Sequence, residues 1–192
     1  MRLVKAASAA LAALTLLALA ACSSGSSAKY THPNADLGAI KRVAVLPFEN
    51  LTQERSASDK VQKVFLSELL ATEAFDVVEP GLVVKALKAE RIESIDAVGP
   101  AEAKRLGETL KAQGLFTGAV VDFAEGRSGN VAAPEVTIQL RLIEVQSGVT
   151  IWTASKTKSG ASASARLFGV GGQTLTEAAR ELMRGQLKGL VK

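Results

Sequence analysis

The sequence feature that most constrains the fold is a short apolar run, Val43–Leu46, inside the segment 41–52 (KRVAVLPFENLT). Four consecutive apolar residues, rich in β-branched side chains and closed by Pro47, predict a strand that is buried on both faces. Pro47 has no amide hydrogen to donate, so regular pairing should stop there. A polar loop, Glu49–Thr52, then precedes a helix-forming segment. A buried strand that runs into a helix predicts a small α/β domain, with helices packed against a sheet.

The next part of the chain predicts helices separated by a second strand. Ser56 is suited to cap a helix that ends near Thr72, and apolar residues recur within this helix at three- and four-residue spacing. Pro80-Gly81 should end the second strand, and Gly114 suits the left-handed cap of a later helix. The other elements expected here are a short strand at 75–78 and helices at Leu82–Arg91 and Ala101–Gln113.

The middle of the chain predicts an antiparallel meander. Leu115–Phe123 is expected to form a central strand, and Glu125–Pro134 a connecting loop. Residues 136–142 alternate between apolar and polar side chains, the pattern of a half-buried strand. Ser147-Gly148 is typical of a hairpin turn, and Val149–Ser155 should return as the partner strand. The fold class is therefore α/β, with a mixed and largely antiparallel sheet; whether the first strand pairs parallel or antiparallel stays open.

The C-terminal part combines a glycine-rich loop with a closing helix. Gly169, Gly171 and Gly172 precede the helix, and free amides at such a place can bind an anion. No Lys-Ser/Thr pair follows and no dinucleotide spacing is present, so a structural turn is favoured over a phosphate site. Thr174 and Glu177 form the pattern of a capping box, and a final amphipathic helix is expected after them.

The N-terminus has the pattern of a bacterial lipoprotein signal. Residues 1–21 combine a basic start with a short apolar core, and Leu19-Ala20-Ala21-Cys22 resembles a lipobox, in which the cysteine is acylated after cleavage. The alternative is an ordinary signal peptide with a free cysteine just past its cleavage site. Ser23, rather than Asp, after the cysteine implies the outer membrane, on its periplasmic face. Residues 22–40 are expected to form the acylated cysteine and a flexible tether, Ser23–Asn34, with a reach of about 40 Å, and 41–192 a single domain.

Composition excludes several classes of function. The formal net charge is +4, and removal of 1–21 leaves 21 basic and 19 acidic residues, a charge of +2 with mixed signs. Such a balance gives no reason to expect nucleic acid binding. Cys22 and His32 are the only cysteine and histidine, so no His/Cys metal site or Cys/His nucleophile pair is possible. No cofactor and no metal are expected.

Together these segments resemble a known family. The N-terminal signal and the order of the elements are similar to those of the CsgG-type periplasmic lipoproteins, a wider group that includes the LpoB-like activators of peptidoglycan synthases and the N-terminal domain of TolB. The resemblance runs from Lys41 to about Leu190 and implies a layered α/β domain with a mixed sheet. The phrases that carry it are VAVLPFEN, FDVVEP, GLFTGAVVDF, VTIQLRLIEVQSGVTIW and ARLFGVGG.

The chain departs from the curli secretion channel of that family at one feature. The channel inserts two long hairpins into the membrane, and the corresponding stretches here are Glu125–Pro134 and Lys156–Thr174. A membrane hairpin needs two strands of about 9–11 alternating residues. The first stretch is too short for a hairpin and the second lacks the alternation. A membrane-tethered domain without these hairpins is therefore the preferred interpretation.

Three functions are open. The first is a non-enzymatic accessory or assembly factor for secretion or cell-envelope biogenesis, acting through contact with an envelope or secretion protein. The second is a subunit of a ring-forming, CsgG-like secretion complex, a homo-oligomer built through the final helix and the Phe168 loop. The third is an enzyme that uses carboxylates near strand ends, Glu49, Asp122 and Glu144; nothing in their spacing pairs them, so an enzyme is not expected. The expected partner contacts are Glu49, Asn50, Arg127, Asn130, Phe168 and Gly169.

Overall fold

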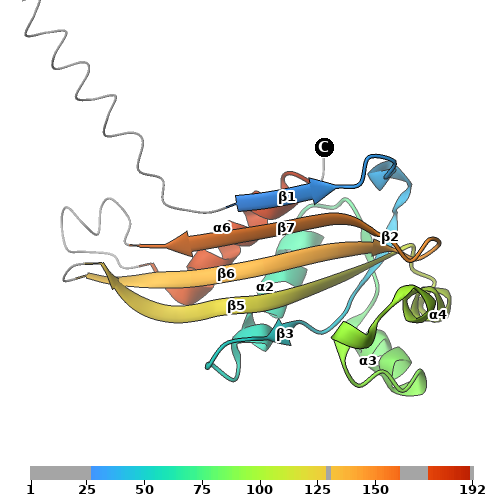
Figure 1. The fold of residues 1–192 in the computed structure, drawn as a ribbon, viewed down its shortest axis with the longest axis horizontal. Helices are drawn as coiled ribbons and strands as arrows, with labels where there is room; N and C mark the ends of the chain where they lie inside the picture. Colours follow the sequence, from blue (N-terminus) through green and yellow to red (C-terminus); the bar gives the residue numbers. More distant parts are fainter. Residues whose placement is uncertain (1–26, 129–130, 161–172, 191–192) are drawn as a thin grey trace, which may run out of the picture.

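The computed structural model of the chain describes residues 27–128, 131–160 and 173–190. Within them a seven-stranded sheet has the order β1-β7-β6-β5-β2-β4, and β3 pairs with β5 beyond the end of β2. Helices cover both faces of the sheet (Figure 1). The strands are β1 (Ser27–Thr31), β2 (Arg42–Val45), β3 (Glu49–Asn50), β4 (Asp76–Val77), β5 (Gly114–Ser128), β6 (Val131–Glu144) and β7 (Thr150–Ser159). The helices are α2 (Ala57–Leu70), α3 (Pro80–Ala89), α4 (Pro100–Leu110) and α6 (Leu175–Leu187), with 3-10 turns η2 (Leu37–Ala39) and η3 (Ile95–Ala97). The α/β class predicted from the sequence is confirmed.

Strand β2 contributes to both hydrophobic layers, as its apolar run predicts. Val43 and Val45 pack in the cluster beneath α2 and α6. Ala44 and Leu46 pack in the second cluster, beneath α3 and α4. The strand pairs in parallel with β4 on one side and β5 on the other, which answers the question that the sequence left open. Parallel strands buried on both faces carry continuous rather than alternating apolar residues.

The meander β5–β6–β7 is antiparallel and much longer than the sequence suggests. Register runs without interruption from Glu125 opposite Pro134 to Ser128 opposite Val131, so the connecting loop predicted over Glu125–Pro134 is wrong. Both strands continue through it as a hairpin. Gly126 and the polar side chains around it resemble a loop, but antiparallel pairing uses backbone groups that every residue except proline supplies. The statement that this stretch is too short for any hairpin is therefore wrong as well, whereas the expectation that it forms no membrane hairpin is not contradicted.

The larger core lies between the sheet and helices α2 and α6. Phe65 of α2 sits at its centre, with its ring centroid 5.4 Å from that of Phe48 and 5.3 Å from that of Phe116. Trp152 of β7 meets Phe116 edge to face at 6.4 Å and is completely buried. Away from these aromatic rings, the Glu68 carboxylate of α2 accepts a hydrogen bond from Arg184 of α6 and links the two helices. The capping box of Thr174 and Glu177 begins α6, as the sequence predicts.

The second face of the sheet is covered at one end only. Helices α3 and α4 pack over β2 and the start of β5, and the longer part of β5, β6 and β7 has no helix on this side (Figure 1). Helix α4 lies so close to the turn after β6 that a Cβ atom at Gly107 would be 2.2 Å from Cγ1 of Val145. The cap of α4 is Lys111, with φ of 50°, instead of the predicted Gly114, which begins β5.

The N-terminal segment departs from the prediction of a flexible tether over Ser23–Asn34. Residues Ser27–Thr31 form β1, antiparallel to β7, with Ser27 opposite Lys156. All five side chains are exposed, so no apolar periodicity announces the strand. Its pairing satisfies the backbone of β7, which would otherwise be an open sheet edge. No helix in the described ranges combines the length and apolar character needed to cross a membrane.

Candidate functional site

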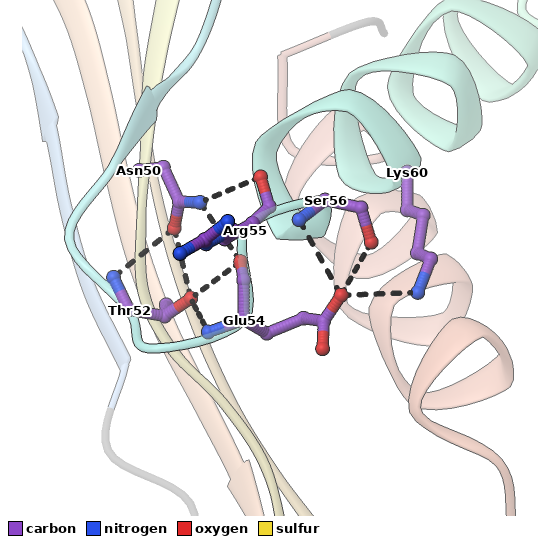
Figure 2. A network of polar contacts seen from close by, with 6 residues as sticks. All are labelled: Asn50, Thr52, Glu54, Arg55, Ser56 and Lys60. Carbon is purple, nitrogen blue, oxygen red and sulfur yellow. Dashed lines mark hydrogen bonds and ion pairs between the residues drawn. The ribbon is translucent and has the colours of Figure 1, made fainter.

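A network of hydrogen bonds organises the β3–α2 loop, residues 50–56 (Figure 2). The Asn50 side chain lies at its centre. Its Nδ2 donates to the carbonyl oxygens of Glu54 at 2.9 Å and Arg55 at 3.3 Å. Its Oδ1 accepts from the backbone amide of Thr52 at 3.1 Å and from the Thr52 hydroxyl at 2.8 Å. One amide side chain therefore binds both ends of the turn and fixes the loop's shape.

A second part of the network fixes the start of α2. The Glu54 carboxylate accepts from the Ser56 hydroxyl and, at 3.4 Å, from Lys60 Nζ. These hydrogen bonds, with that from Ser56 first, hold the pKa of Glu54 below its ordinary value. Ser56 occupies the N-cap position, but its hydroxyl donates to Glu54 and caps no helix amide. The side-chain cap that the sequence predicts at Ser56 is therefore absent.

The organised loop presents an apolar side chain to solvent. Leu51 is 56% exposed. Its backbone amide donates to the Val120 carbonyl of β5 at 2.9 Å, so the residue sits on a fixed backbone beside the sheet. A large apolar side chain held outward at a defined place favours binding a protein, because little conformational entropy remains to be lost.

A shallow hollow of about 510 Å³ lies next to this loop, on the helix-free part of the second sheet face. Arg141 of β6 donates from Nε to the Thr117 hydroxyl of β5 at 3.2 Å. The hollow is also lined by Tyr30 of β1, Glu49 of β3 and Asp96 of η3. The surface is rich in hydroxyl, amide and charged groups and presents both signs of charge.

The structure brings together two of the six residues expected to contact a partner. Glu49 lines the hollow and Asn50 organises the adjoining loop. Arg127 lies far along β5, opposite Ala132 in the extended hairpin, away from both. Asn130, Phe168 and Gly169 lie outside the described residues, as does Cys22.

The acidic residues weighed for catalysis do not meet. Glu49 is opposite Ala119 of β5, whereas Glu144 is opposite Gly114 at the start of that strand and accepts from Ser147. Asp122 is eight residues beyond Gly114 on β5, which corresponds to about 27 Å along a strand. In the described part of the chain no three His, Cys, Asp or Glu side chains are grouped to hold a metal ion.

Sequence reasoning missed several residues of this region. In the pattern Asn50-x-Thr52-x-Glu54-x-Ser56, the first three side chains each accept a hydrogen bond from the backbone amide two residues later. Polar residues at this spacing predict an organised turn. Arg141 and Thr117 gave no such signal, because their neighbourhood depends on the register of β5 against β6.

Comparison with known proteins shows both a family and a fold. The model of the family described as "Peptidoglycan-synthase activator LpoB" matches residues 18–157. Among solved structures, the PelC dodecamer from Paraburkholderia phytofirmans is similar with a TM-score of 0.60 and 22% identity, covering 87% of this chain and 97% of that one. Lipoprotein GNA1162 from Neisseria meningitidis has a TM-score of 0.54 and 13% identity, covering 78% and 99%. No curated protein matches. At these identities the two structures indicate a shared fold.

Proposed function

Since the family match spans most of the chain, this protein belongs to the LpoB family of peptidoglycan-synthase activators, and we propose that it activates a peptidoglycan synthase by direct contact, without catalysis of its own. The match over residues 18–157 is the observation that carries the proposal. We propose further that Cys22 is acylated and holds the protein to the periplasmic face of the outer membrane. The matched range includes both Cys22 and the β3–α2 loop.

The β3–α2 loop is the proposed contact surface. Its shape is set before binding by the bonds of Asn50 and Glu54, so the synthase meets a formed surface with Leu51 at its apex. Burying one leucine against a partner contributes about 2 kcal/mol. The polar groups around Leu51 supply the rim that surrounds the apolar centre of a protein interface.

The experiment measures the glycan polymerisation rate of purified synthases of the same organism against increasing concentrations of the mature protein in detergent. Leu51→Asp places a charge at the proposed centre and should raise the half-maximal concentration at least tenfold. Leu82→Asp is the matched control, because Leu82 is 49% exposed on α3, away from this loop. Equal behaviour of the two variants would exclude the loop as the contact, and absence of activation by the unchanged protein would refute the proposed function.

A second candidate is a ring-forming role of the CsgG type, in which copies of the chain assemble around a secretion path. Similarity of fold to a protein solved as a dodecamer favours it. Light scattering over a concentration series distinguishes the two. A discrete high-order assembly would support the ring, and a monomer at all concentrations would support the tethered activator.

A further inference from the structure

Strand β1 leaves only a short link between the proposed anchor and the folded domain. Cys22 and Ser27 are five residues apart, and a chain of that length spans at most about 18 Å. Residues Ser27–Thr31 of the expected tether are paired with β7, so they add nothing to the distance that the link can span. With Cys22 acylated, the start of β1 must therefore stay within about 18 Å of the lipid surface.

Four lysines gather where the chain enters the domain, and we call them the entry patch: Lys29, Lys156, Lys158 and Lys188. Ser27 is opposite Lys156, and Lys29 is opposite Ala154. Alternate residues of a strand share a face, so Lys29, Lys156 and Lys158 lie on the side of the sheet that α6 covers. Lys29 donates from Nζ to the carbonyl of Gly189, the residue that follows Lys188, so the end of α6 lies next to Lys29.

The charge of this patch is predominantly positive. The carboxylate of Glu181 in α6 contacts the patch, where it accepts a hydrogen bond from Lys158. That hydrogen bond, more than any other cause, lowers the pKa of Glu181, so its carboxylate stays ionised and offsets one lysine. Three of the four cations remain to attract an anionic surface.

We propose that the entry patch binds the anionic headgroups of the membrane that carries the anchor, so that the domain lies against the bilayer along its β1 edge. The proposal rests on acylation of Cys22, which is part of the proposed function. The length of the link brings the patch to the lipid surface, and charge complementarity selects the headgroups. Each lysine near an anionic surface strengthens such binding about fivefold, and salt weakens it.

This orientation directs the β3–α2 loop away from the lipid. In the sheet, β7, β6 and β5 separate β1 from β3, and four strand spacings correspond to about 19 Å (Figure 1). The proposed contact surface then stands no more than about 40 Å from the headgroups. A synthase that uses this loop must itself extend to that distance from the membrane.

The experiment measures the rate of lysine acetylation, by mass spectrometry, in the mature acylated protein reconstituted into vesicles. Vesicles of phosphatidylcholine alone are compared with vesicles that contain one quarter phosphatidylglycerol. We expect acetylation of Lys29 and Lys188 to slow at least fivefold in the anionic vesicles and to recover in 1 M salt. Lys85 and Lys88, exposed on α3, should not change. Equal rates in the two kinds of vesicle would overturn the proposal.

Paired variants provide the control. Lys156→Gln with Lys158→Gln should abolish the protection of Lys29, whereas Lys85→Gln with Lys88→Gln, which removes the same charge, should leave it intact. Loss of protection in both pairs would show a response to net charge and would refute a localised patch. The mass of the Cys22 peptide reports acylation separately, and the synthase assay in detergent contains no bilayer. Failure of membrane docking is therefore distinguishable from failure of the proposed function.

Discussion

Substitution of Gly107 by alanine tests the contact that holds α4 against the sheet. A Cβ atom at this position would lie 2.2 Å from Cγ1, 2.3 Å from Cγ2 and 2.8 Å from Cβ of Val145. Carbon atoms in good contact are about 3.5–4.0 Å apart, so the two elements must separate by more than about 1 Å. Rotation of the valine side chain gives no relief, because its own Cβ is too close. The substitution therefore has to displace backbone.

The expected cost follows from two opposing effects. Overpacking of this kind costs about 1–3 kcal/mol, and the displaced backbone places Gly107→Ala near the upper end. Alanine in a helix interior is favoured over glycine by about 1 kcal/mol. The free energy of unfolding should therefore fall by about 2 kcal/mol, which corresponds to a melting temperature lower by about 5 °C for a domain of this size.

Urea unfolding followed by tryptophan fluorescence measures this change, because Trp152 is the only tryptophan and is completely buried. Gly81→Ala on α3 is the control, since a Cβ there meets nothing within 4 Å, and it should be neutral or slightly stabilising. Adding Val145→Ala removes the contacts at 2.2 Å and 2.3 Å but leaves that of Cβ at 2.8 Å, so it should relieve part of the cost of Gly107→Ala. A Gly107→Ala protein as stable as the parent, or strict additivity of the two substitutions, would refute the reasoning.

Two further predictions use the same measurement, and a third uses the melting temperature as a function of pH. Glu68→Gln should lower the free energy of unfolding by about 1–2 kcal/mol, because Glu68 is buried and binds Arg184 at 2.6 Å; the arginine's exposure limits the loss, and an unchanged midpoint would contradict it. Gly148→Ala should cost at least about 1 kcal/mol, because φ there is 69° and the new Cβ would lie 2.5 Å from Pro100 Cβ; a stable variant would contradict this. The amide and hydroxyl of Thr174 lower the pKa of Glu177, so its contribution to stability is complete above the ordinary value of about 4.5 and is lost as pH falls through the lowered pKa. The melting temperature of Glu177→Gln should therefore fall less between pH 6 and pH 3 than that of the parent, and parallel curves would argue against this cap as a source of acid sensitivity.

Several elements were predictable because their signals are local. The run Val43–Leu46 predicted a strand buried on both faces, and the two clusters that it enters confirm this. Thr174 and Glu177 predicted the start of α6, because a capping box involves only four consecutive residues. Asn50 was selected from the polar loop, and the spacing to Thr52 and Glu54 explains its central place there.

Other elements were not predictable because their partners are distant in the sequence. Strand β1 has five exposed side chains and forms by pairing with an edge more than a hundred residues away. The extension of β5 and β6 through Gly126 depends on backbone pairing that side-chain patterns do not announce. The distance between Gly107 and Val145 likewise follows from how α4 rests on the sheet.

The sequence by itself determined the α/β class, the dual burial of β2 and the start of the closing helix, because each depends on the periodicity or chemistry of neighbouring residues. The tertiary structure alone decided that β1 belongs to the sheet and that three lysines of distant segments join Lys29 where the chain enters the domain. It also decided that Glu49 and the β3–α2 loop lie four strand spacings from β1, across the sheet. These arrangements arise from backbone hydrogen bonds between strands, and such bonds are nearly independent of which side chains the strands carry.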